Sequence, residues 1–294
     1  MPCKINRKRL WTHRIILESL THENNSFVTL TYDDENLPEN GSLKPDDYQK
    51  FIKRLRRKLP QRIRFYLVGE YGDRTWRPHY HFALFGASCP NADIFGHSVK
   101  GCECHLCTSI RTAWGKGNID TGTLNKDSAQ YISGYVTKKM TKPDDPRLQG
   151  RHPEFARMSN RPGIGADAML VVADALNSKF GDSMLTEQGD VPISLKHGKR
   201  SLPLGRYLRN KLREFAQIEE TVNPQTGEIK YAAHENAKTE YKKEMQALYF
   251  DFIKGKEYLP NKFDFFKNHL VKQEKQKVLN IETRSKIFKK EKTI

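Results

Sequence analysis

The sequence predicts an α+β fold that contains an antiparallel β-hairpin. Three short runs rich in β-branched and aromatic residues, at 27–32, 64–71 and 79–85, are typical of strands. Apolar residues at helical spacing occur at 4–20, 45–59 and 129–140, so helices are expected before, between and after these strands. A short loop joins the second and third strands, which favours antiparallel pairing between them.

Composition points to a packed, basic protein. The chain has 294 residues, 37% of them hydrophobic, with 51 Lys and Arg against 35 Asp and Glu, a formal charge of +16. That excess predicts a polyanionic partner, and nucleic acid is the first candidate. A membrane surface is the competing partner, but we find no apolar run of 18 residues and no signal peptide. We therefore expect a cytoplasmic protein with no membrane partner.

The first two predicted helices carry basic faces. Residues 4–20 form an approximate apolar stripe with basic residues on the other side. Pro45 opens the second helix, and Pro60 ends it. Arg54 and Arg57 lie off the apolar stripe of this second helix, so they are either solvated surface residues or phosphate contacts.

Two histidines in the third strand form the first candidate site. His79 and His81 are two residues apart, and their side chains therefore lie on the same face of a strand. Glu70 ends the neighbouring hairpin strand and is the natural third ligand of a divalent cation. The alternatives are a pair of hydrogen-bonded core histidines and a surface carboxylate paired with Arg74 or Arg77.

Residues 86–128 are expected to be an irregular, cysteine-rich insertion. The chain has five cysteines, an odd number that argues against a disulfide framework. Four of them lie in this insertion, and thiolates at this density can hold a tetrahedral structural Zn²⁺: Cys89, Cys102, Cys104 and Cys107. The alternative is a set of free thiols.

The helix at 129–140, with Ser128 as its predicted N-cap, carries the second candidate site. Tyr131 and Tyr135 are four residues apart and therefore share one face, with Lys138 and Lys139 one turn further on. Taken alone, two such tyrosines are most often half-buried packing residues.

Together, these features indicate phosphoryl chemistry on DNA. A cation on the histidines and the carboxylate would be a Lewis acid at the scissile phosphate, and a tyrosine hydroxyl would be the nucleophile. Lys138 or Lys139 would stabilise the developing charge. The substrate would be single-stranded or extruded DNA. Basic residues beside these elements are the predicted DNA contacts: Arg54, Arg57, Arg77 and Lys142.

Three ordered motifs, at 27–32, 77–81 and 131–139, resemble the HUH endonucleases. Among these, the chain is most similar to the rolling-circle replication initiation proteins of microviruses, the gokushovirus-like single-stranded DNA phages. The resemblance extends to about residue 215. It implies a five-stranded antiparallel sheet flanked by helices, a ferredoxin/RRM-like palm, followed by a helical, basic extension over 216–294. The expected domains are thus 1–215 and 216–294.

The resemblance also implies an activity and partners. The family nicks the viral strand at the origin of replicative-form DNA, forms a 5′-phosphotyrosyl intermediate and leaves a 3′-hydroxyl primer, and its two tyrosines alternate in cleavage and rejoining. The implied cofactor is Mg²⁺ or Mn²⁺, and the implied partners are a host helicase and polymerase in the bacterial cytoplasm. Relatives often carry a lysine three residues after each tyrosine. Here Gly134 follows Tyr131 at that spacing, whereas Lys138 follows Tyr135, which favours Tyr135 as the initiating nucleophile.

Two alternatives remain open at this point. Within the superfamily, a transposase or relaxase is the nearest rival. From a different class, the rival is a non-catalytic, zinc-stabilised DNA-binding protein in which the histidines are structural and the tyrosines stack on bases.

Overall fold

The computed structural model describes residues 2–72, 75–91, 101–138, 144–178, 190–198, 200–216, 220–222 and 229–231, and shorter pieces at 243, 246–254, 271–272, 275 and 279. The chain divides into two compact units. The larger unit comprises Arg7–Met169 and Lys196–Leu204, and the other comprises Met1–Asn6, Leu170–Leu195 and Gly205–Ile294. The domain boundary expected at residue 215 stays a prediction.

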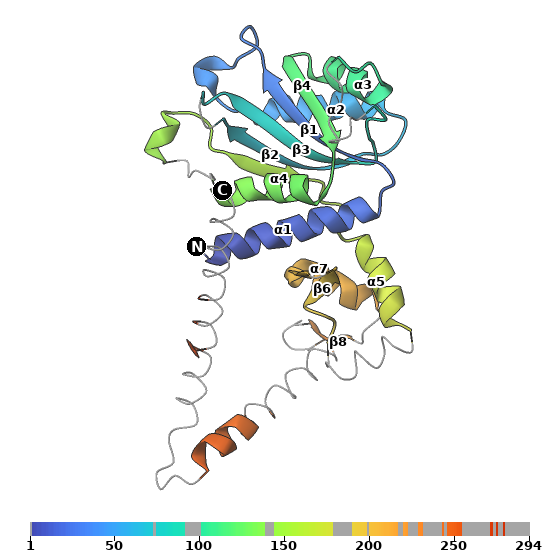
Figure 1. Ribbon diagram of the computed structural model, residues 1–294, viewed down its shortest axis with the longest axis vertical. Coiled ribbons are helices and arrows are strands. Elements are labelled where there is room, and N and C mark those ends of the chain that lie inside the picture. Colours follow the sequence, from blue (N-terminus) through green and yellow to red (C-terminus); the bar gives the residue numbers. More distant parts are fainter. Residues whose placement is uncertain are drawn as a thin grey trace. The chain divides into compact units, whose positions relative to one another are not determined.

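A five-stranded antiparallel sheet forms the centre of the larger unit (Figure 1). Its strand order is β4-β1-β3-β2-β5, and each neighbouring pair is antiparallel. The predicted α+β class and five-stranded sheet are therefore confirmed. The strands are β1 (Asn25–Tyr32), β2 (Arg64–Tyr71), β3 (Pro78–Phe85), β4 (Gly117–Thr123) and β5 (Phe155–Met158).

Helices cover both faces of this sheet (Figure 1). The helices of the larger unit are α1 (Pro2–Leu20), α2 (Pro45–Lys58), α3 (His105–Trp114) and α4 (Lys126–Lys138). Alternate residues of β1 supply the two faces. Leu30 lies in a core with Leu55 of α2 and Ile110 of α3. On the other face, Ile15 of α1 and Ile132 of α4 lie in a second core, and Thr29 and Thr31 point to this side because strand side chains alternate.

The segment expected to be irregular contains a helix and a strand. α3 begins at an unusual cap, because the sulfur of Cys104 accepts a hydrogen bond from the Cys107 N–H. β4 is an edge strand with few strong β-formers, so its pairing with β1 rather than its own composition specifies it. Gly117 starts β4 with φ +134°, where a Cβ would collide with the backbone of residues 31–33. β5 is the other edge strand, and it was not among the predicted strands.

The tyrosine helix begins earlier than predicted. The side-chain oxygen of Asn125 accepts hydrogen bonds of 2.9 Å from the N–H groups of Asp127 and Ser128. Ser128 in turn accepts one of 2.8 Å from the Asn125 N–H. This reciprocal arrangement makes Asn125 the cap and Ser128 a residue of the first turn. The prediction of Ser128 as N-cap was wrong by three residues, but the face that carries the tyrosines is unaffected.

Further elements lie outside the sheet and the helices that cover it. They are α5 (Ala168–Leu176), β6 (Ser194–His197), β7 (Arg200–Pro203), α7 (Gly205–Phe215), β8 (Glu220–Val222), β9 (Ile229–Tyr231) and the single turns Glu39–Gly41 and Pro146–Leu148. β8 and β9 pair in a region expected to be helical. Within the smaller unit, Asp190 pairs with Arg209 and Arg213 of α7. Among the described residues, no helix is long and apolar enough to cross a bilayer.

Candidate active site

The register of the sheet brings the predicted metal ligands together. His79 lies directly opposite Glu70 of β2, which confirms the predicted hairpin. On the other side of β3, His79 lies opposite Thr31 and His81 lies opposite Thr29. These side chains share one face because each pair is directly opposed and the spacing along each strand is two residues.

His81 and Glu70 form a buried pair. The Nε2 atom of His81 lies 2.9 Å from Oε1 of Glu70, and the two residues are 6% and 4% exposed. The other carboxylate oxygen, Oε2, is buried and has no hydrogen-bond partner in the described part of the chain. A buried carboxylate oxygen without a partner is costly, and a bound cation would satisfy it. Glu70 therefore fits the role of a metal ligand.

The two threonines fix the orientation of the histidine rings. The hydroxyl of Thr29 lies 3.0 Å from Nδ1 of His81, and the hydroxyl of Thr31 lies 2.9 Å from Nδ1 of His79. Because both Nδ1 atoms have a threonine partner, Nε2 is the atom that each ring can offer to a cation. The donor set of two Nε2 atoms and one carboxylate fits a divalent ion.

Gly72 leaves room beside one of these nitrogens. A Cβ at Gly72 would lie 3.1 Å from Nε2 of His79, closer than ordinary side-chain contacts. The glycine does not adopt a left-handed backbone conformation, so a turn does not explain its presence. Any side chain at position 72 would therefore crowd the Nε2 atom of His79.

Helix α4 places both tyrosines beside His81. The ring of Tyr135 stacks on the imidazole with centroids 5.2 Å apart and an interplanar angle of 7°. The ring of Tyr131 meets the same imidazole edge-on at 5.6 Å, and the two tyrosine rings are 4.8 Å apart. Tyr131 is 51% exposed, whereas Tyr135 is half-buried.

The environment keeps the Tyr135 phenol protonated in the metal-free protein. Burial, then hydrogen bonding with Tyr131, then the nearby charge of Glu70 raise the pKa of Tyr135 well above its ordinary value. A phenol in this setting becomes a competent nucleophile only when its proton is lost during the attack.

The structure describes the positions of three other predicted site residues, Arg54, Arg57 and Arg77. Arg54 and Arg57 are exposed on α2, which covers the opposite face of the sheet. Arg77 precedes β3, donates to the Tyr32 carbonyl at 2.7 Å and pairs with Asp34. Lys139 and Lys142 lie outside the described residues, and so does the side chain of Lys138 at the end of α4.

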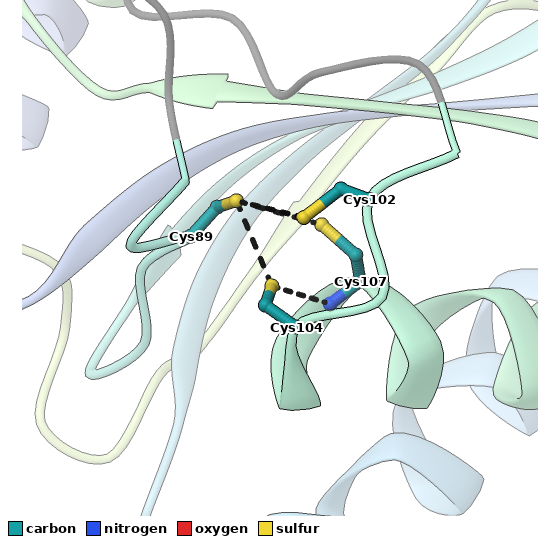
Figure 2. A group of neighbouring side chains, drawn as sticks. All are labelled: Cys89, Cys102, Cys104 and Cys107. Atoms are coloured by element: carbon teal, nitrogen blue, oxygen red, sulfur yellow. Dashed lines mark hydrogen bonds between the residues drawn. The ribbon is translucent and has the colours of Figure 1, made fainter.

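A second group of possible ligands lies after β3. The sulfur atoms of Cys89, Cys102, Cys104 and Cys107 all lie within 4.8 Å of one another, and Figure 2 shows them turned toward a common centre. The sequence prediction that these four cysteines form one cluster is thus confirmed, and the cluster could hold a metal ion.

Sequence analysis missed three residues of the histidine site. Thr29 and Thr31 lie in a predicted strand that carries the resemblance, but no contact with the histidines was predicted for them, although their two-residue spacing matches that of the histidines. No role beside His79 was predicted for Gly72. Their roles depend on cross-strand partners, which the strand pattern alone does not reveal.

The chain is similar to replication-associated proteins. Residues 25–140 match the family Replication-associated protein ORF2/G2P. That match spans β1 to the tyrosine helix and confirms the predicted resemblance to phage replication proteins. No solved structure matches the chain.

Curated proteins similar to this chain come from three phages. The chain is 35% identical to replication-associated protein VP4 of Bdellovibrio phage phiMH2K over 49% of its length, and 36% identical to replication-associated protein ORF2 of Spiroplasma virus 4 over 64%. It is 30% identical to replication-associated protein ORF4 of Chlamydia phage 1 over 47%. The aligned regions span 48%, 60% and 36% of these relatives' own lengths.

Proposed function

We propose that this protein is a metal-dependent endonuclease and strand transferase that nicks viral DNA at a replication origin and so initiates rolling-circle replication. The observation that carries the proposal is the stacking of Tyr135 on His81, whose Nε2 atom meets buried Glu70. A nucleophile is thereby placed against the residues that fit a cation. The names of the phage relatives support a role in replication.

The proposed cofactor is Mg²⁺ or Mn²⁺, held by His79, His81 and Glu70. When bound, such an ion supplies Lewis-acid stabilisation of charge on the scissile phosphate. Thr29 and Thr31 orient the two imidazoles. Gly72 has no side chain that would crowd the Nε2 atom of His79.

The proposed cleavage step uses Tyr135. Its hydroxyl oxygen attacks the phosphorus, a 5′-phosphotyrosyl bond forms, and the bond from phosphorus to the 3′ oxygen breaks. Overall, the phenolic proton ends on the departing 3′ oxygen, so the product is a primer with a free hydroxyl. Lys138 and Lys139 are proposed to stabilise the incipient phenolate.

Tyr131 is the proposed second nucleophile. Its ring meets the same imidazole as Tyr135, and its greater exposure leaves it open to a second DNA end. The phosphotyrosyl bond preserves the phosphodiester energy, so rejoining of the displaced strand needs no nucleotide cofactor.

The proposed partners are single-stranded DNA, double-stranded origin DNA, and the helicase and polymerase of a bacterial host, with action in the host cytoplasm. The formal charge of +16 supports binding of a polyanion. Arg54, Arg57, Arg77 and Lys142 are proposed DNA contacts. Because α2 covers the far side of the sheet, its two arginines would contact DNA away from the cleaved phosphate.

An adduct assay tests this function. The protein is incubated with Mn²⁺ and labelled single-stranded oligonucleotides that tile the DNA carrying its gene. We expect an SDS-resistant adduct with one oligonucleotide, and its loss in the double variant Tyr131→Phe/Tyr135→Phe. Tyr66→Phe is the matched control, because the buried Tyr66 hydroxyl lacks a hydrogen-bond partner among the described residues. Absence of any adduct, or an undiminished one from the double variant, would refute the proposal.

The cysteine cluster supports one rival, a zinc-stabilised DNA-binding protein without catalysis. Such a protein would retain the oligonucleotide in a native gel but form no SDS-resistant species. A transposase or relaxase would also form an adduct, but on the ends of a mobile element or on a transfer origin.

A further inference from the structure

We propose that Cys89, Cys102, Cys104 and Cys107 bind one structural Zn²⁺, and that this ion holds the connection between β3 and β4 in place. The site is separate from the histidine site, and the proposal stands without the nicking activity. Cys89 follows β3, Cys102 and Cys104 directly precede α3, and Cys107 lies in the first turn of that helix (Figure 2).

The three distances from the sulfur of Cys89 to the other sulfur atoms match tetrahedral coordination, and all four sulfur atoms lie within 4.8 Å of one another. A regular tetrahedron of sulfurs about 2.3 Å from a central zinc ion has edges of about 3.8 Å. The sulfur of Cys89 lies 3.7 Å from that of Cys102, 3.6 Å from that of Cys104 and 3.7 Å from that of Cys107. A disulfide requires about 2.05 Å, so none of these three pairs is bonded.

Donors around the cluster suit thiolates. The Cys107 N–H donates to the Cys104 sulfur at 3.4 Å, at the N-terminus of α3, where the helix dipole favours negative charge. The hydroxyl of Thr121 on β4 lies 3.1 Å from the Cys107 sulfur, and the Asn91 amide donates to the Cys102 sulfur at 3.7 Å. Contacts of this kind around metal ligands orient them and tune their charge.

Packing does not account for the cluster. Cys89, Cys102 and Cys107 are buried and together form a small apolar group; among the described residues, Cys104 is the one partly buried apolar side chain packed against it. No Leu, Ile, Val or Phe belongs to this group among the described residues. A buried group made only of cysteines is a poor core but a complete set of zinc ligands.

The closeness of the four sulfur atoms also favours a cation. All four lie within 4.8 Å of one another. Four thiolates at such distances would repel one another, and a divalent cation at their centre offsets that repulsion.

The geometry also indicates which elements the ion would stabilise. It joins the chain just after β3 to the start of α3, and Thr121 links the cluster to β4. From α3, Trp114 is fully buried and donates to the Thr31 carbonyl at 3.2 Å. The zinc ion thus anchors the helix and edge strand that flank β1.

Metal analysis tests the proposal on the full chain. After extensive dialysis, mass spectrometry of the metals should find one zinc per chain in the wild type, in Cys3→Ser and in His79→Ala/His81→Ala. Cys104→Ser/Cys107→Ser should retain less than a tenth of that amount. No metal, iron in place of zinc, or zinc that disappears with the histidines and remains without the cysteines would overturn the proposal.

A second measurement on the wild type covers the case in which the cysteine variant does not fold. A thiol reagent applied to the native protein should label four fewer cysteines before zinc chelation than after it, without any reductant. Equal labelling before and after chelation would overturn the proposal. Thiols that appear only after reduction would also overturn it, because they would indicate disulfides.

Discussion

The histidine site and the cysteine cluster belong to the same unit, but the chain assembles them in different ways. The histidine site draws on β1, β2, β3 and α4, which extend from residue 25 to residue 138; strand register aligns the three strands, and Tyr135 of α4 stacks on His81. The cysteine cluster draws on residues 89–107 alone. The paired strands of the sheet hold the side chains of the histidine site in position. The cysteine cluster lies in a connection between strands, so the bound ion itself would hold its side chains in position. The first therefore suits chemistry and the second suits anchoring.

The largest expected effect is a loss of activity when the histidine site, but not the surroundings of the cysteine cluster, is changed. His81→Ala should reduce the rate of adduct formation by about 10⁴-fold, the scale on which loss of one essential catalytic group acts. It removes a proposed ligand and the surface on which Tyr135 stacks. The matched control is His105→Ala, because His105 is exposed beside the cysteines. A rate of adduct formation by His81→Ala within tenfold of the wild-type rate would contradict a catalytic role for the histidine site. The readout is the initial rate of adduct formation with Mn²⁺.

The second effect separates the sites by stability. At free zinc about 1,000 times its dissociation constant, the bound ion should add about 4 kcal/mol to the free energy of unfolding. Urea unfolding with and without a zinc chelator measures this difference. Hydrogen exchange should then show that chelation loosens α3 and β4 while the β2–β3 hairpin stays protected. Equal unfolding midpoints with and without zinc would contradict an anchoring role.

The third effect compares the threonines that contact each set of ligands. Thr31→Val removes the partner of His79 Nδ1 with little change in shape, and it should weaken Mn²⁺ activation by about 10- to 100-fold. Thr121→Val removes the partner of the Cys107 sulfur and should weaken zinc binding instead. Titrations of adduct formation with Mn²⁺, and of zinc release with a chelator, measure the two. The two sites are not independent if Thr31→Val weakens zinc binding as much as Mn²⁺ activation, or if Thr121→Val weakens Mn²⁺ activation as much as zinc binding.

The smallest effect compares two glycines. Gly72→Ala places a methyl group 3.1 Å from His79 Nε2 and should weaken Mn²⁺ activation by about tenfold, or about 1.4 kcal/mol. In Gly134→Ala, the new methyl meets Lys8 at an ordinary 3.5 Å and should stabilise the helix by up to about 1 kcal/mol. Mn²⁺ titration and thermal unfolding provide the readouts. Full activation of Gly72→Ala would show that the His79 nitrogen is not a ligand.

Sequence patterns predicted the central hairpin because its signals are local. Residues 64–71 and 79–85 have strong strand composition, and period two places His79 and His81 on one face. The i and i+4 spacing likewise placed Tyr131 and Tyr135 on one side of α4. The facing of that helix toward His81 is tertiary information, and only the resemblance supplied it.

The sequence patterns did not predict the elements whose structure depends on contacts with distant parts of the chain. β4 and β5 are edge strands specified by pairing with β1 and β2. The cap of α3 is a cysteine sulfur rather than a common capping oxygen, so its start was missed. Thr29, Thr31 and Gly72 act through partners about 50 residues away or across a loop, which no window of sequence contains.

The central claim is that Tyr135 attacks DNA beside the histidine site, and mass spectrometry of the covalent adduct tests it most directly. After digestion with protease and nuclease, the nucleotide-bearing peptide should contain residue 135, with the modification on the tyrosine oxygen. Tyr135→Phe should shift any remaining adduct to Tyr131, because both rings meet the same imidazole. An adduct mapped to a residue outside α4 would contradict the account.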